Sequence, residues 1–188
     1  MERRSPFAHP IYELAAGGAP TAFGETRASM LPTVDYAQLE RQLRALVDGE
    51  PDALANCANF AALLAMEIPA LNFAGLYFLR GEDLVLGPFI GKPACTRIRV
   101  GRGVCGQAFQ RDESILVDDV NAFDDHIACD TASLSELVVP LRIGRRPIGV
   151  VDCDSPLAAR FTQGDRVGLE RIASALAECV NLTSLLDL

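Results

Sequence analysis

The residues best suited to chemistry are four cysteines, a histidine and several carboxylates in the turn-rich sequence between residues 91 and 154. Thiol redox chemistry needs a thiolate and a second thiol that can reach it. Cys129 lies in a polar segment between His126 and Asp130, and Cys95 lies in a second loop-like segment. These two cysteines are therefore a candidate redox pair, with a pair of unremarkable loop cysteines as the open alternative.

Two acids near the end of this stretch are placed to act together. Asp152 and Asp154 are two residues apart in a predicted strand, so both side chains project from one face and Cys153 projects from the other. Two carboxylates on one face can bind an ammonium group or share a proton. The alternative is a strand that runs out into solvent.

A zinc site is a weaker interpretation of the same residues. His126, Cys129, Cys95 and Cys105 are suitable donors, but they include no C-x-x-C pair, with which structural zinc sites usually begin. A loop histidine that hydrogen-bonds its neighbours is the better account of His126. We expect no bound metal.

Gly101, Gly103 and Gly106 match the G-x-G-x-x-G pattern of nucleotide-binding loops. That pattern requires a long helix in a βαβ unit, whereas the helical stretch after Gly106 is only about two turns long. Tight turns beside Cys105 are the better explanation of these glycines. Cys57 and Cys179 lie on or near apolar helix faces, so both are predicted to be structural.

Composition limits the class of protein. The 188 residues suit one domain, and an apolar fraction of 49% is ample for a core. The net charge of −8 argues against nucleic-acid or membrane-surface binding. We find no secretory signal and no run of about 18 apolar residues. We therefore expect a cytoplasmic protein whose cysteines are not a disulfide framework.

Hydrophobic periodicity predicts an α+β domain over residues 34–188, after an irregular arm at residues 1–33. Helices flank a mainly antiparallel sheet in this prediction. The 72–79 strand is apolar on both faces, so it should lie centrally. The first predicted helix starts at Tyr36, with Asp35 as its cap. The second starts with Pro51 and Asp52 in its first turn and stops at Pro69. Two more helices are predicted over 104–111 and 163–186. The predicted strands are 72–79, 84–89, 97–100, 114–117, 135–143 and 148–153, with 121–131 irregular. The last helix has a predicted apolar stripe of Val167, Leu169, Ile172, Leu176 and Val180.

Five motifs, in this order and at these separations, resemble the free methionine-(R)-sulfoxide reductases, which are built on a GAF domain. The resemblance spans residues 35–180. The motifs are GKPAC (Gly91 to Cys95), GRGVCG (Gly101 to Gly106), HIACD (His126 to Asp130), SELVVPL (Ser135 to Leu141) and DCDSP (Asp152 to Pro156).

The resemblance implies roles for individual cysteines. Cys129 is the implied catalytic thiol, which attacks the sulfoxide sulfur, releases methionine and becomes a sulfenic acid. Cys95 is the implied resolving thiol, and Cys105 an auxiliary or alternative resolver. Thioredoxin, supplied by its reductase and NADPH, would reduce the resulting disulfide, and no cofactor would be bound.

The resemblance also implies a substrate pocket. The implied pocket carboxylates would bind the ammonium of the substrate and protonate the departing oxygen. The substrate carboxylate would meet backbone N–H groups of the His126 to Cys129 segment. A homodimer is compatible with the resemblance. The implied substrate-binding residues are Glu136, Asp152, Asp154, Phe73, Tyr77 and Ile127.

Two positions depart from the family pattern. Phe73 stands where the family commonly has tryptophan, and Cys153 stands where it tends to have an aliphatic residue. A smaller ring loosens the expected apolar wall without removing it, and Cys153 is expected to be structural. A non-catalytic GAF module that binds a small ligand, or a thiol sensor of oxidants, is the alternative function. Neither alternative needs both the cysteine pair and the three acids.

Overall fold

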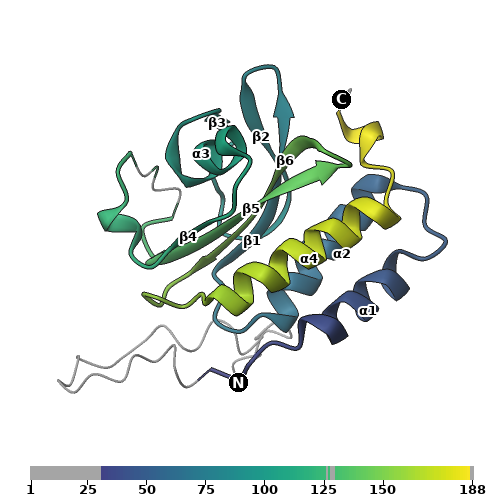
Figure 1. Ribbon diagram of the computed structural model, residues 1–188, viewed down its shortest axis with the longest axis horizontal. Coiled ribbons are helices and arrows are strands. Elements are labelled where there is room, and N and C mark those ends of the chain that lie inside the picture. Colours follow the sequence, from purple (N-terminus) through teal and green to yellow (C-terminus); the bar gives the residue numbers. More distant parts are fainter. Residues whose placement is uncertain (1–30, 126, 128–129, 187–188) are drawn as a thin grey trace, which may run out of the picture.

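The computed structural model describes residues 31–125, 127 and 130–186. Within them, one antiparallel sheet has the strand order β3-β2-β1-β6-β5-β4 (Figure 1). The sheet confirms the predicted α+β class and the interior position of β1. The strands are β1 (Phe73–Arg80), β2 (Asp83–Gly91), β3 (Arg97–Arg99), β4 (Ile115–Val117), β5 (Ser135–Ile143) and β6 (Arg146–Ser155).

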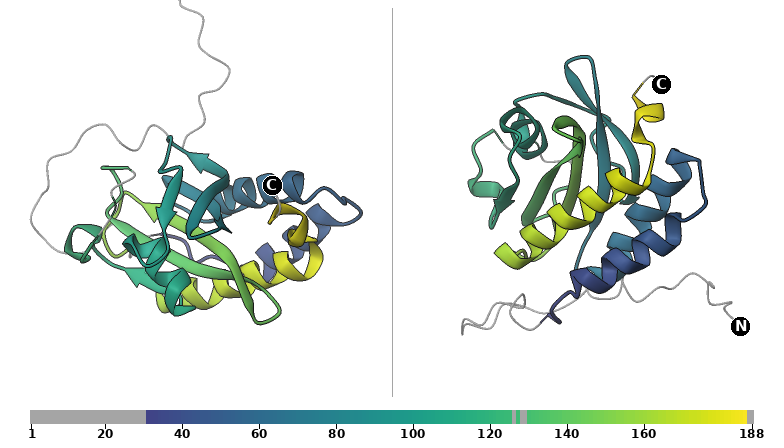
Figure 2. Two further views of the ribbon diagram at one scale, coloured as in Figure 1. Left: turned by 90° about the horizontal axis from the view of Figure 1, so that it is seen from above. Right: turned by 45° about the vertical axis from the view of Figure 1, so that its right-hand side comes forward.

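Helices cover the two faces of this sheet unequally. One face carries α1 (Tyr36–Val47), α2 (Ala53–Glu67) and α4 (Gln163–Cys179), and the other carries α3 (Gly103–Arg111) (Figures 1 and 2). Two separate apolar clusters result, because each face buries its own side chains. The α3 face is the one that holds the candidate site.

Aspartate side chains cap the first two helices of the domain, α1 and α2. The side chain of Asp35 accepts a hydrogen bond from the Gln38 N–H and caps α1, as predicted. The start of α2 was predicted two residues too early, because Asp52 is its N-cap and Pro51 lies outside the helix. Leu39 and Leu43 of α1 are fully buried, and α1 packs against α4 and α2.

The last helix differs from the prediction in length and in one apolar position. Val180 is extended, so α4 ends at Cys179 and the chain continues as the short 3-10 helix η4 (Leu182–Leu185). Leu182 and Leu185 are buried beside α2, which explains why the apolar pattern continues after the helix ends. Val167 is 59% exposed and is not part of the buried stripe.

Other predicted features lie partly outside the described residues. The irregular arm is described only from residue 31 onward, and residues 126, 128 and 129 are not described. The stretch predicted to be irregular overlaps a 3-10 turn, η3 (Val120–Ala122), whose N-cap is Asp119. None of the described helices is long and apolar enough to cross a membrane.

Candidate active site

Sheet register places three acids and two rings on the α3 face. Asp154 of β6 pairs with Phe73 of β1 on one side and with Glu136 of β5 on the other. Asp152, two residues back, projects from the same face of the sheet and pairs with Gly75, which has no side chain to cover it. The predicted shared face of the two aspartates is therefore observed, and Glu136 joins them from the neighbouring strand.

Cys105 of α3 completes this cluster from above the sheet. Its thiol donates a long hydrogen bond to Glu136 Oε1, at 3.9 Å. The Cys105 Sγ and one carboxylate oxygen each of Glu136 and Asp152 all lie within 4.8 Å of one another. All three side chains are buried, and Asp152 Oδ1 has no hydrogen-bond partner among the described residues. An unpartnered, buried carboxylate oxygen calls for a ligand that donates a hydrogen bond.

Burial controls the ionisation of these acids. Loss of hydration raises the pKa of Glu136 well above its usual range, and the neighbouring charges of Asp152 and Asp154 raise it further. Burial likewise raises the pKa of Asp152 to about 7. Burial, followed by the charge of Asp152, raises the pKa of Asp154. At neutral pH the cluster therefore retains protons, so it can donate one to a bound oxygen.

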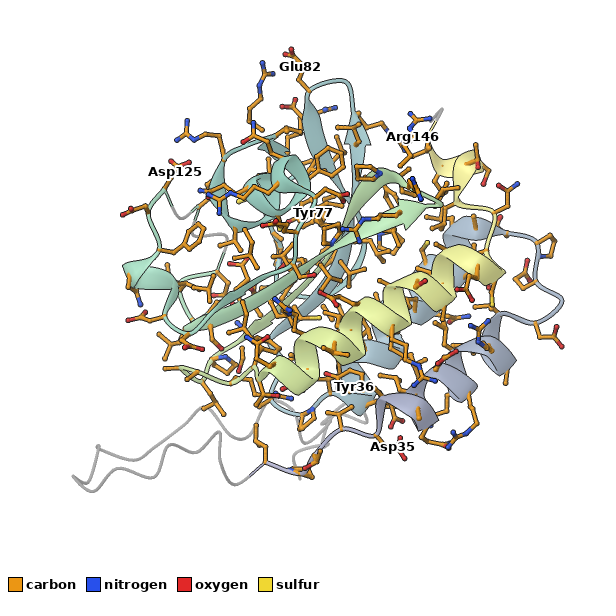
Figure 3. The ribbon with its side chains drawn as sticks, in the orientation of Figure 1. Asp35, Tyr36, Tyr77, Glu82, Asp125 and Arg146 are labelled. Carbon is orange, nitrogen blue, oxygen red and sulfur yellow. The ribbon has the colours of Figure 1, made fainter. Side chains whose placement is uncertain are left out.

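Aromatic rings form an apolar wall beside the acids. The rings of Phe73 and Phe89 are stacked with centroids 5.5 Å apart, and those of Phe73 and Tyr77 are 6.5 Å apart. Gly75 lies under Phe73, where an added Cβ would be 2.8 Å from the ring. Tyr77 belongs to the cluster beneath α3 and is labelled in Figure 3. Burial raises the pKa of its hydroxyl, so the ring stays neutral.

Two hollows share Asp130, Asp152 and Asp154 in their walls, so they lie side by side over the acids. The first reaches the loop after β2, and the second reaches the start of α3. The remaining residues of the first are Asn72, Phe73, Tyr77, Lys92, Pro93 and Ala94. Those of the second are Ile98, Gly103, Val104, Cys105, Ile127, Ser133 and Glu136.

A hydrogen-bonded network, which we did not foresee from the sequence, borders the first hollow. Asn72 Nδ2 donates to Asp130 Oδ2 at 3.2 Å and to Ser133 Oγ at 3.0 Å. Lys92 Nζ forms an ion pair with Asp130 Oδ1 at 3.2 Å. The sequence signals for this network are that Lys92 lies in the GKPAC motif, that Asp130 lies in the HIACD motif, and that Lys92 is the sole lysine among 17 lysine and arginine residues.

Arg102 holds the other side of the same segment. Its guanidinium makes a two-point ion pair with Asp125, with both N–O distances 2.5 Å. Asp125, labelled at the edge of the molecule beside α3 in Figure 3, also accepts a hydrogen bond from the Gly103 N–H. The residues that flank 126–129 are thus attached to the start of α3 on one side, and to Asn72 just before β1 and the loop after β2 on the other.

The predicted site residues are mostly brought together. The site lining includes every implied substrate-binding residue and Cys105. Cys95 lies next to the wall residue Ala94, packs against the α3-face cluster and is disulfide-bonded in this structure. Cys129 and His126 lie outside the described residues, so their predicted roles remain predictions.

The other sequence features resolve into structural roles. Gly106 meets the Arg99 carbonyl, which lies 2.4 Å from where a Cβ would be, so close packing explains this glycine. Cys57 and Cys153 are buried on the opposite face, as predicted. Cys179, predicted to be structural because it lies near an apolar stripe, is exposed and accepts a hydrogen bond from an Arg44 nitrogen at 3.1 Å.

Comparison with known proteins agrees with this fold and site. The GAF domain model matches residues 38–180. Free methionine-R-sulfoxide reductase of Escherichia coli is 47% identical over 154 residues, covering 82% of this chain and 93% of that protein. The reductase of Saccharomyces cerevisiae is 36% identical over 147 residues, covering 74% and 82%.

A solved structure of a reductase with its substrate is also similar to this chain. Free methionine-R-sulfoxide reductase of Neisseria meningitidis, in complex with its substrate, is 39% identical with a TM-score of 0.74, covering 86% of this chain and 94% of that one. Fold and site thus define a GAF domain. Within that class, the chain belongs to the family of the free methionine-R-sulfoxide reductases.

Proposed function

We propose that this protein reduces free L-methionine-(R)-sulfoxide to methionine. The observation that carries the proposal is the buried group of Glu136, Asp152 and Asp154 beside an aromatic wall. Methionine sulfoxide offers an ammonium, a polar S–O group and an S-methyl group. The acids suit the first two and the rings of Phe73 and Tyr77 suit the third.

The proposed chemistry has two steps on the protein. The Cys129 thiolate attacks the sulfoxide sulfur, the S–O oxygen passes to Cys129 as a sulfenic acid, and methionine leaves. The Cys95 thiol then attacks the sulfenic sulfur, forming a disulfide and releasing water. Reduced thioredoxin then reduces the Cys95–Cys129 disulfide by thiol–disulfide exchange and is itself oxidised. Thioredoxin reductase and NADPH supply the electrons.

The acid cluster has two tasks in this scheme, and protonation state separates them. A carboxylate must be ionised to pair with the ammonium, and a carboxylic acid must be protonated to assist the S–O oxygen. Because burial raises the pKa of each acid, and neighbouring charges raise those of Glu136 and Asp154 further, the cluster holds both forms near neutral pH. We infer that the three acids act as one coupled unit.

The rings and the 126–129 segment complete the proposed substrate contacts. Phe73 and Tyr77 would pack against the S-methyl group, with Ile127 facing the second hollow. The substrate carboxylate would accept hydrogen bonds from backbone N–H groups of residues 126–129.

A stoichiometric reaction without reductant tests this scheme. Reduced protein is mixed with an equal amount of the R epimer, and methionine is measured after acid quench. Wild-type protein and Cys95→Ser should each release about one methionine per chain, and Cys129→Ser should release none. Dimedone should label only the Cys95→Ser product, because its sulfenic acid has no resolving partner. Methionine release by Cys129→Ser would overturn the assignment.

A further inference from the structure

We propose that Lys92 is a positioning residue: its ion pair with Asp130 holds the Cys95 segment against the segment that carries Cys129, so that the disulfide forms rapidly. The proposal rests on the proposed function, because it concerns the second chemical step. It adds a determinant of that step which lies outside the acids, the rings and the cysteines.

Asp130 is a fixed anchor for this pair. Its Oδ1 accepts the Ala132 N–H at 2.9 Å, and its Oδ2 accepts from Asn72 Nδ2 at 3.2 Å. The Asn72 N–H in turn donates to the Asp154 carbonyl oxygen at 3.0 Å, which attaches this residue to the end of β6. The position of the carboxylate is thus set by the sheet.

Asp130 is also held in its ionised form. The hydrogen bond from the Ala132 N–H lowers its pKa most, and Lys92 and Asn72 lower it further. Its side chain is 13% exposed, whereas that of Lys92 is 65% exposed. A largely buried anion therefore pairs with an exposed cation, and the lysine side chain is the partner able to move.

Because each charged residue lies close to one of the two cysteines in the sequence, the ion pair limits how far apart Cys95 and Cys129 can be. Lys92 precedes Cys95 by three residues, at most about 10 Å of extended chain, and Asp130 directly follows Cys129. A disulfide requires the two Cα atoms to approach within about 7 Å. The ion pair is present in a structure in which Cys95 is disulfide-bonded, so it is compatible with the bonded geometry. Forming the ion pair before the bond would narrow the range of separations that the Cys95 and Cys129 segments must sample, which raises the rate of disulfide formation.

The choice of lysine at this position supports a specific role. Every other basic side chain of lysine or arginine type in the chain is arginine. An ammonium is a compact charge with freely rotating donors, whereas a guanidinium is a broad plane that favours two-point contacts. The carboxylate oxygens of Asp130 already serve two other donors, so a single-point partner fits.

Single-turnover kinetics separate this effect from the first chemical step. Reduced protein is mixed with the R epimer, and samples are quenched over time. One portion is assayed for methionine and the other is alkylated and mapped for the Cys95–Cys129 disulfide. In Lys92→Gln we expect disulfide formation to slow by about fivefold, as loss of a partly exposed ion pair allows. The methionine rate should change much less.

A control near Cys95 and a double variant sharpen the result. Arg97→Gln also removes an exposed positive charge close to Cys95, but Arg97 pairs with Asp83 at 3.9 Å, so its disulfide rate should stay at the wild-type value. Asp130→Asn should slow the disulfide step, and Lys92→Gln/Asp130→Asn should be no slower than Asp130→Asn alone. Normal disulfide formation in Lys92→Gln, or equal slowing in Arg97→Gln, would overturn the proposal.

The ion pair itself can be observed without turnover. Reductive ¹³C-methylation keeps the charge and labels the chain only at Lys92 and the N-terminal amine. The Lys92 methyl resonance should shift when Asp130 is changed to Asn, and should not shift in Asp83→Asn. An unmoved resonance would overturn the ion pair. Wild-type protein that releases no methionine would instead contradict the proposed function, and this spectrum would still test the pair.

Discussion

At the scale of single residues, the candidate site combines groups that are costly to place together. Glu136 and Asp152 are both less than a tenth exposed, and Asp152 Oδ1 has no partner among the described residues. A structure selected for stability alone would fill this space with apolar side chains. The acids are therefore best explained by what they bind. The free energy of unfolding that they cost the protein should be measurable.

Replacing Asp152 with asparagine should stabilise the protein at alkaline pH. Because the native pKa of Asp152 is raised from 3.8 to about 7, the native state keeps a proton that the unfolded state releases between these values. Stability contributed by this group is thus lost as pH rises through that interval. Urea unfolding near pH 8 should show Asp152→Asn more stable by on the order of 2 kcal/mol, with little difference near pH 4.

The same substitution at an exposed site is the control for this prediction. Asp48, which follows α1 and is exposed, should show no comparable pH-dependent gain when changed to asparagine. A gain of equal size at both sites would mean that net charge, and not burial of Asp152, governs the effect.

Cys105 should be dispensable for turnover in a way that Cys95 is not. Burial, with the charges of Asp152 and Glu136, raises the pKa of the Cys105 thiol well above its usual range, so little thiolate forms. In a thioredoxin-coupled assay, Cys105→Ala should retain most multi-turnover activity and Cys95→Ala should stop after one turnover. Loss of turnover in Cys105→Ala, with normal methionine release in a single turnover, would instead make Cys105 an obligatory resolver.

At the scale of elements, the site depends on how closely α3 approaches the end of β3. An added Cβ on Gly106 would lie 2.4 Å from the Arg99 carbonyl oxygen, which belongs to the backbone and cannot yield without moving the strand. Cys105 is the neighbouring residue, so the depth of α3 sets the height of its thiol above Glu136. The absence of a side chain at Gly106 thus sets the position of Cys105 over the acid cluster.

Gly106→Ala should therefore destabilise the protein by about 2 kcal/mol or more, because a side chain is forced into well-packed structure. Gly164→Ala is a matched control, since its Cβ would meet only the Thr162 hydroxyl at an ordinary 3.4 Å. Thermal unfolding compares the two. Equal melting temperatures for both variants would contradict the packing argument for α3.

Prediction from the sequence succeeded where local periodicity decides the outcome. Strand alternation placed Asp152 and Asp154 on one face and Cys153 on the other, and the two-sided apolar pattern placed β1 inside the sheet. It failed at the end of α4, because the apolar residues Leu182 and Leu185 continue the pattern after the helix has stopped. Periodicity reports burial but not the backbone conformation that achieves it.

The polar network could not be predicted for a different reason. Asn72 contacts Asp130 and Ser133 across 58 and 61 residues, so no local pattern records the contact. Cys179 shows the same limit, since its exposure depends on how α1 and α4 pack, and not on its place near an apolar stripe. Tertiary contacts between distant segments require the fold itself.

At the scale of the whole molecule, the sheet separates stability from chemistry. Three helices and the larger apolar cluster lie on one face (Figure 2), and the acids, rings and Cys105 lie on the other. Loops after β2 and before β5 then enclose the acids. This division lets one face carry unfavourable buried charge while the opposite face supplies most of the apolar burial.

The most direct test of the central claim is the consumption of separated R and S epimers of free L-methionine sulfoxide by the full chain. Thioredoxin, its reductase and NADPH are supplied, and NADPH oxidation is followed. We expect oxidation with the R epimer, none with the S epimer, and none with Cys129→Ser. No NADPH oxidation with either epimer, by protein shown to be reduced and folded, would contradict the account and favour a ligand-binding GAF module or a thiol sensor.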